Sequence, residues 1–178
     1  MKTNGIIRKV DGLGRVVIPR EYRKLHRISL GDPMEISCLD SGEIVLKKMD
    51  MTLALEELSG EALRVLSECV SGTVLVSNLD KWLGGSGSDK GMFIGKDIPQ
   101  AIKSKLMRRE DYSIIDINEI GDASLRCDRR MAIVAEPIAG DGDVFGAFYV
   151  TGSDSVSERD IALIRVAAVI LGNSLQKF

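Results

Sequence analysis

The spacing of apolar residues changes near residue 50, and this change limits the chain to two differently built parts. Between residues 34 and 46, apolar and polar residues alternate or form short β-branched runs, a pattern that predicts strands. From Leu55 to Cys69 the apolar residues recur every three or four positions, which predicts a helix. We therefore expect one domain at 1–50, a linker at 51–54 and a second domain at 55–178.

The first fifty residues are expected to form two strand pairs around a short helix. Strands are predicted at 6–10 and 15–18, on either side of the turn sequence at 11–14. Pro19 ends the second strand, because proline lacks an N–H for the ladder and suits the first turn of a helix. A helix is predicted at 20–26, followed by a second hairpin at 34–39 and 43–46.

This first domain is too small to be stable by itself. A unit of this size with such short strands buries too little surface, and its sequence offers no disulfide or metal pattern to support it. We expect it to share one core with a second copy of the chain. A two-fold dimer would repeat every surface charge.

The second domain is expected to be α+β. After the helix from Leu55, strands are predicted at 73–77, 112–117, 131–138 and 144–151, with a helix at 98–109 and a final helix that opens on a capping box at 157–160. This order predicts an antiparallel sheet with flanking helices. The apolar stripes of the first and last helices either form an intermolecular bundle or pack on their own sheet, and their spacing leaves both arrangements open.

Basic residues gather in one stretch of a slightly acidic chain. The whole chain carries a net charge of −2, whereas residues 8–27 hold seven Lys and Arg against two Asp and Glu. Such an excess favours a polyanionic partner, although a solvated charged face has the same composition, and charge alone does not separate DNA from RNA or an acidic protein. The basic residues of this stretch are Arg8, Lys9, Arg15, Arg20, Arg23, Lys24 and Arg27. The last four follow helical spacing and should share one face.

Two runs in the first domain, GIIRKVD at 5–11 and LGRVVIP at 13–19, resemble the AbrB-type swapped-hairpin DNA-binding family over residues 3–48. The resemblance implies a mainly-β barrel made by two chains that exchange hairpins, with double-stranded DNA as the partner. By position it implies DNA contacts from Arg8, Lys9, Arg15, Arg23 and Lys24, and the helix face adds Arg20. Position 24 is more often arginine in that family, and lysine keeps the charge but lacks the bidentate fork. Such proteins favour AT-rich, deformable DNA, which readout of DNA shape would explain.

The layout of the second domain resembles a GAF domain, and the whole chain resembles a sporulation regulator of endospore-forming bacteria. This implies a transcription regulator of sporulation genes that represses some promoters and activates others. It would act as a homodimer through the first domain and as a homotetramer through the C-terminal helices, with the GAF-like domain sensing a signal or driving assembly. An antitoxin-like interaction protein is the alternative, because the swapped-hairpin fold also occurs there. A folded second domain in place of a disordered tail counts against it.

Three features of the second domain are candidates for holding a small molecule. Backbone amides at 84–88 either cradle a phosphate or belong to a mobile surface loop. Trp82 either stacks on a ligand or lies in the core. A group of arginines either meets an acidic ligand or lies in a solvated loop: Arg126, Arg129 and Arg130. We expect no cofactor, and the sequence does not name a ligand.

The sequence gives no support for catalysis or a metal site. His26 is the single histidine and lies in the basic helix, without a serine or cysteine arrangement beside it. Cys38 and Cys69 fall on apolar positions and are expected to be small core residues. Cys127, next to Arg126, is either a redox-responsive thiol or an inert one. We expect neither an enzyme nor a metal-binding protein.

The sequence also favours a location inside the cell. No apolar run follows the start at Met1, so no signal peptide is expected. The longest apolar run, 166–171, is too short to cross a bilayer. Three scattered cysteines suit a reducing compartment. We expect a cytoplasmic, nucleoid-associated protein without a membrane partner.

Overall fold

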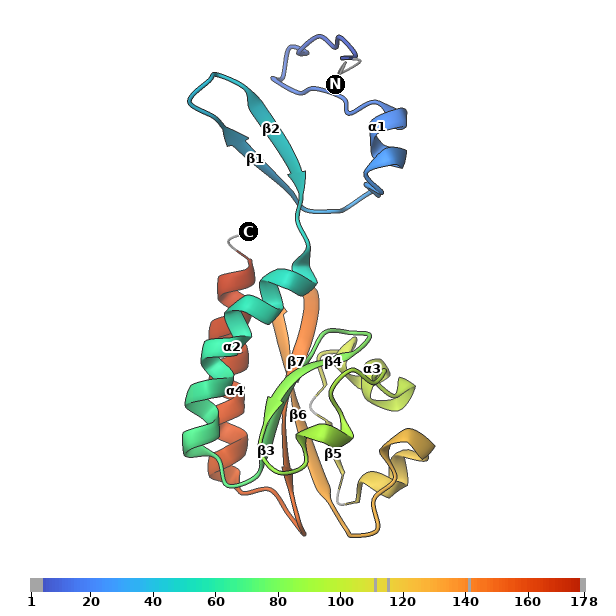
Figure 1. The fold of residues 1–178 in the computed structure, drawn as a ribbon, viewed down its shortest axis with the longest axis vertical. Coiled ribbons are helices and arrows are strands. Elements are labelled where there is room, and N and C mark those ends of the chain that lie inside the picture. Colours follow the sequence, from blue (N-terminus) through green and yellow to red (C-terminus); the bar gives the residue numbers. More distant parts are fainter. Residues whose placement is uncertain (1–4, 111, 115, 141, 177–178) are drawn as a thin grey trace. The chain divides into compact units, whose positions relative to one another are not determined.

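A computed structural model describes residues 5–110, 112–114, 116–140 and 142–176. The chain forms two compact units, unit 1 at Met1–Met49 and unit 2 at Asp50–Phe178 (Figure 1). Residues 51–54, for which the sequence predicts a linker, form the first turn of helix α2 (Met51–Cys69) instead. The physical reason is an N-cap: the Asp50 carboxylate accepts the N–H groups of Thr52 and Leu53 at 3.0 and 3.3 Å, which satisfies donors that a helix start leaves unpaired.

Residues 5–49 of unit 1 form one short helix and one hairpin. Helix α1 spans Arg20–Leu25, and strands β1 (Met34–Cys38) and β2 (Ile44–Lys48) pair antiparallel with Met34 opposite Lys48. The predicted helix and second hairpin are therefore confirmed. Helix α1 has no side-chain cap at its N-terminus and buries none of its residues, so little within its own sequence stabilises it.

The predicted strands at 6–10 and 15–18 are absent from the described part of unit 1. Only the turn between them forms: the Asp11 N–H donates to the Arg15 carbonyl at 3.0 Å, and Gly14 adopts a φ of +77°. A strand needs a hydrogen-bonded neighbour, and one chain does not supply it for these runs. Their apolar side chains are left in solvent, with Ile7 91% and Val17 72% exposed. Cys38, expected in the core, is exposed as well, because it is the last residue of β1 in a two-stranded hairpin, which buries little side-chain surface.

Unit 2 is built on a five-stranded antiparallel sheet in the order β4-β3-β7-β6-β5. The strands are β3 (Thr73–Ser77), β4 (Trp82–Ser86), β5 (Tyr112–Ile114), β6 (Ala132–Gly140) and β7 (Asp143–Gly152). The predicted strands at 73–77, 131–138 and 144–151 are confirmed. The strand predicted at 112–117 is shorter, since 117 opens a 3-10 helix, and its residue 115 lies outside the described residues.

Helices flank this sheet, as predicted, and they cover both of its faces. Helices α2 and α4 (Glu158–Leu175) lie on one face, and helix α3 (Gln100–Leu106) lies on the other with three 3-10 turns (Figure 1). The turns are η1 (Lys90–Met92), η2 (Ile117–Ile120) and η3 (Ala123–Leu125). Along β3, Val74 and Val76 join the core under α2 and α4, whereas Leu75 joins the opposite core, which is the period of two that a strand imposes.

The end of α2 and the start of α4 are joined by a hydrogen bond. Ser157 caps α4 by accepting the Asp160 N–H at 3.1 Å, which confirms the predicted helix start. The buried Asp160 carboxylate accepts the N–H of Ser71 at 3.4 Å, in the turn that follows α2. No helix in the ranges described above is long and apolar enough to span a membrane.

The glycine-rich segment around residue 85 corrects one prediction. It is the edge strand β4, paired with β3, and neither a loop nor a phosphate cradle. A Cβ on Gly85 would lie 2.5 Å from the Leu75 side chain and 2.8 Å from the Val74 carbonyl, so glycine allows the close approach of the two strands. Trp82, at the start of β4, is 1% exposed and contacts Phe93 and Tyr149 at ring-centroid distances of 5.0 and 4.3 Å. It is a core residue, one of the two predicted alternatives.

Candidate nucleic-acid interface

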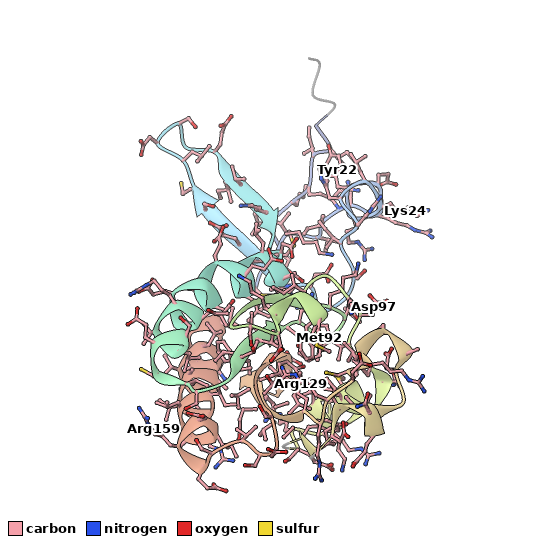
Figure 2. The ribbon with its side chains drawn as sticks, turned by 60° about the horizontal axis from the view of Figure 1, so that its bottom comes forward. Tyr22, Lys24, Met92, Asp97, Arg129 and Arg159 are labelled. Atoms are coloured by element: carbon pink, nitrogen blue, oxygen red, sulfur yellow. The ribbon has the colours of Figure 1, made fainter. Side chains whose placement is uncertain are left out.

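Helix α1 presents three of the predicted basic residues to solvent. Arg20, Arg23 and Lys24 are all exposed, and their spacing of three and four places them on one face of the helix. None of the three makes an ion pair with another described residue. The Lys24 side chain extends away from the helix (Figure 2). This face therefore offers cations whose charge is not neutralised within the part of unit 1 that the structure describes.

Arg27, predicted on the same face, leaves it. The helix ends at Leu25, and Arg27 adopts a left-handed backbone with a φ of +51°. The Ile28 N–H donates to the Arg23 carbonyl at 2.7 Å, and the Arg27 N–H donates to the Lys24 carbonyl at 3.3 Å. These two bonds form a Schellman motif, which usually has glycine at the position that Arg27 occupies.

Substitution Arg27→Gly is therefore expected to stabilise unit 1. Glycine adopts the left-handed region without the Cβ clash that penalises other residues, so the free energy of unfolding should rise by about 1 kcal/mol. Urea unfolding of the full chain, followed by a fluorescent or circular-dichroism signal from unit 1, measures the change. A loss of stability would show that the Arg27 side chain supports the fold.

The remaining predicted cations lie before the helix, and two of them make short-range contacts. Arg15 pairs with Asp11, its Nε donating to Oδ2 at 2.8 Å, and the Arg15 side chain stays 70% exposed. Asp11 also accepts the N–H groups of Leu13 and Arg15 at 2.9 Å each. These hydrogen bonds, led by the backbone N–H of Arg15, hold the pKa of the Asp11 carboxyl below its usual range. Arg8 donates to the Ile7 carbonyl at 3.1 Å, and Lys9 is exposed.

One charged contact of unit 1, between Lys48 and Asp32, was not predicted from the sequence. Lys48, the last residue of β2, lies with its Nζ 2.6 Å from Asp32 Oδ2 and donates to the Arg27 carbonyl at 2.8 Å. Asp32 Oδ2 also accepts the Ser29 N–H at 2.6 Å. The hydrogen bond from Lys48 is the main cause that lowers the pKa of Asp32. The two residues are sixteen positions apart in the sequence, so no local pattern indicates the pair.

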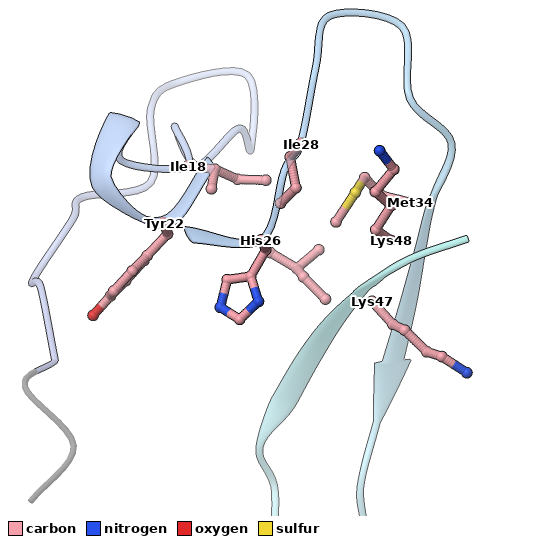
Figure 3. Close-up of a pocket in the computed structure, with 8 residues that line it drawn as sticks. Ile18, Tyr22, His26, Ile28, Met34, Lys47 and Lys48 are labelled. Carbon is pink, nitrogen blue, oxygen red and sulfur yellow. The ribbon is translucent and has the colours of Figure 1, made fainter. Parts of the chain in front are cut away.

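A hollow of about 470 Å³ lies between α1 and the hairpin of unit 1 (Figure 3). Its lining is mostly apolar and includes Ile18, Ile28, Met34 and Leu46, with the ring of His26 beside them. Figure 3 shows that the Lys47 ammonium points away from the other labelled side chains. An apolar hollow in a unit that also exposes apolar runs is a surface suited to covering by other apolar side chains.

Unit 2 carries a second apolar depression, on the outer side of its paired helices. A groove of about 450 Å³ runs between α2 and α4. Val65 on α2 and Val166 and Ile170 on α4 line it and are 46%, 59% and 61% exposed. Glu61 and Ser174 are its polar lining residues. Exposed apolar side chains along two neighbouring helices are typical of helix-bundle contacts.

The interior under α3 is filled with side chains. Trp82, Phe93 and Tyr149 are each 1% exposed or less, and the Tyr149 hydroxyl shares a 2.8 Å hydrogen bond with Ser77 Oγ. Burial raises the pKa of Tyr149 well above its usual range.

The three candidate ligand arginines lie outside this interior. Arg126, Arg129 and Arg130 are exposed, and Arg129 pairs with Asp89. Cys127 is half-buried. Within the described ranges no three His, Cys, Asp or Glu side chains are grouped to hold a metal ion.

Both units match known families. Residues 54–176 match the family model described as stage V sporulation protein T C-terminal, transcription factor. Residues 7–52 match the model of antidote-toxin recognition MazE, bacterial antitoxin. Stage V sporulation protein T of Bacillus subtilis (strain 168) is 29% identical over 178 residues, which cover 99% of this chain and 100% of that protein. Transition state regulatory protein AbrB of the same organism is 54% identical over 48 residues, which are 27% of this chain and 49% of that protein.

Solved structures resemble unit 2. The GAF domain/HD domain protein from Geobacter sulfurreducens superposes with a TM-score of 0.57 at 18% identity, covering 68% of this chain and 92% of that one. This likeness shows the fold, which is the predicted GAF-like α+β domain. The AbrB match confirms the resemblance stated for the first fifty residues. Since the first family model spans well over half of the sequence, the chain belongs to the stage V sporulation protein T C-terminal family of transcription factors, with an AbrB-type region ahead of a GAF-like domain.

Proposed function

We propose that this chain regulates sporulation genes by binding duplex DNA through the basic face of unit 1. The observation that carries the proposal is a set of exposed cations on α1 that make no ion pair with any described residue: Arg20, Arg23 and Lys24. Phosphates are the natural partners of such a face, because each neutralised phosphate releases condensed counterions. Arg8, Lys9 and Arg15, close to the turn at residues 11–15, would extend the contact along the backbone of the duplex.

Two copies of unit 1 would form a dimer and bind DNA together. The unit leaves most of its apolar residues in solvent, with Leu30 fully exposed and Ile7 nearly so, and it carries an apolar hollow beside α1. The runs at 6–10 and 15–18 of a second copy would gain strand partners and burial there, as in a swapped-hairpin dimer. The two-fold symmetry of such a dimer repeats each cation on the second half of the DNA site.

The GAF-like unit would then join dimers into a tetramer. The groove between α2 and α4 is apolar and exposed, whereas the described interior under α3 is packed with aromatic side chains. These two observations support assembly over small-molecule sensing. Linking two DNA-binding dimers raises the overall affinity without new contacts to DNA.

The sites would be AT-rich promoters on the cytoplasmic nucleoid, some repressed and others activated. Lysine at position 24 lacks the fork that reads guanine, which supports recognition through DNA shape. An antitoxin-like role is the second candidate, because residues 7–52 match a bacterial antitoxin model. In the described part of the chain a folded domain follows these residues, rather than a tail that could wrap a toxin.

A DNA titration at several salt concentrations tests this proposal. Substitutions Arg23→Ala and Arg15→Ala should each weaken binding to an AT-rich duplex. Each should also make the plot of log K against log salt less steep by roughly 1.8, because a dimer loses two phosphate contacts of about 0.9 each. Arg64→Ala is the matched control, since Arg64 lies on α2 and pairs with Glu61 and Glu68.

The outcomes separate the candidates. Unchanged affinity and slope in both variants would remove the proposed face, and absence of salt-dependent binding by the unsubstituted chain would favour the antitoxin-like role.

A further inference from the structure

Helix α1 depends on contacts outside its own sequence. Six residues are too few for a helix to be stable alone, and α1 has neither a side-chain N-cap nor a buried residue. The backbone of Arg23 takes part in the Schellman bond from Ile28 at 2.7 Å. Whatever holds this C-terminal end therefore also sets the direction of the Arg23 and Lys24 side chains.

Lys48 holds that end from the hairpin. Its ammonium contacts the Arg27 carbonyl at 2.8 Å and Asp32 Oδ2 at 2.6 Å, and Asp32 in turn accepts the Ser29 N–H. One cation thus joins the end of α1, the loop after it and the last residue of β2. The Lys48 side chain is 37% exposed and the Asp32 side chain 22%, so both are partly withdrawn from solvent.

The neighbouring residue, Lys47, points in a different direction from Lys48. Successive residues of a strand point to opposite faces, and the Lys47 ammonium points away from the hollow (Figure 3). Lys47 makes no ion pair with another residue in the described part of the chain. Of these two adjacent lysines of equal charge, Lys48 contacts the end of α1 and Lys47 makes no ion pair with a described residue.

We propose that Lys48 is a positioning residue for DNA binding: together with Asp32 it clasps the C-terminal end of α1 and sets the direction in which Arg23 and Lys24 meet the duplex. This inference rests on the proposed function. It assigns Lys48 to the alignment of other cations and not to phosphate contact, because its ammonium is already engaged by the Arg27 carbonyl and the Asp32 carboxylate.

Substitution of Asp32 distinguishes the clasp from a simple effect of charge on DNA binding. On charge alone, removing an acidic residue from a basic DNA-binding unit should tighten binding to a polyanion. On the clasp model, Asp32→Asn should weaken it about tenfold, because Arg23 and Lys24 still reach the phosphates but are no longer held in place before binding in either copy. Lys48→Met should weaken binding to the same extent without changing the salt slope. The double variant Asp32→Asn/Lys48→Met should be no weaker than either single variant, because the two act as one unit.

The experiment combines DNA titrations with amide hydrogen exchange on the full chain. Lys48→Arg should restore affinity, and Lys47→Met should leave it unchanged. Exchange of the peptide around 20–29 should speed up in Lys48→Met and Asp32→Asn but not in Lys47→Met. Tighter binding by Asp32→Asn, or a slope about 1.8 less steep in Lys48→Met, would overturn the clasp.

The exchange readout does not depend on DNA. If the unsubstituted chain binds no duplex while exchange still speeds up in both clasp variants, the proposed function fails and the structural clasp stands. If exchange is unchanged in both variants, the clasp fails whatever the chain binds.

Discussion

Substitution Ile170→Glu should split the proposed tetramer into dimers and weaken binding to a duplex with two sites by about a hundredfold, the loss expected when two linked binding modules act separately. Ile170 lies in the groove between α2 and α4 and is 61% exposed in one chain. Glutamate is therefore tolerated by the isolated unit. In a helix bundle the same carboxylate would lose its water without gaining a cation, and burying an unpaired charge costs several kcal/mol.

Light scattering or sedimentation measures the mass, and the DNA titration measures the loss of avidity. Met107→Glu is the matched control, because Met107 is 57% exposed and follows α3, on the other face of the sheet. Binding to a single-site duplex should be equal in both variants. A tetramer that persists in Ile170→Glu would exclude the groove as the joining surface.

Substitution Gly172→Ala should destabilise unit 2, although alanine is the better helix former. A Cβ on Gly172 would lie 2.2 Å from the Ala139 carbonyl oxygen and 3.0 Å from its carbon. This neighbour is backbone of β6, so α4 must move away from the sheet. We expect a clash of about 3 kcal/mol, the upper end for overpacking, against a gain of about 1 kcal/mol in helix propensity. The net loss is about 2 kcal/mol.

Gly60 provides the comparison within the same unit. It lies inside α2, is exposed, and a Cβ there would meet nothing within 4 Å. Gly60→Ala should therefore stabilise by about 1 kcal/mol through propensity alone. Urea unfolding at one fixed protein concentration compares the two, because assembly makes stability depend on concentration. If Gly172→Ala stabilises as much as Gly60→Ala, helix α4 is not held against β6 as described.

Local patterns in the sequence were enough for most elements of unit 2. Strands β3, β6 and β7 were predicted from short apolar, β-branched runs, and α2 and α4 from spacings of three and four. The caps at Asp50 and Ser157 show where local prediction reaches its limit. Ser157 was recognised, whereas the cap at Asp50 was missed and its helix turn was taken for a linker. Strand β4 was missed because Gly84 and Gly85 have no side chains to show a period, and their role is to let β3 come close.

The basic residues of the candidate interface were all visible in the sequence, because charge composition and the resemblance to AbrB-type domains depend only on residue identity. Their arrangement was not. Arg27 follows the helical spacing yet leaves the face, since the Schellman bonds end α1 before it. The clasp between Lys48 and Asp32 joins residues that only the folded hairpin brings within 2.6 Å. Periodicity acts between neighbours along the chain, whereas ion pairs, glycine contacts and strand partners for 6–10 and 15–18 depend on segments meeting in space.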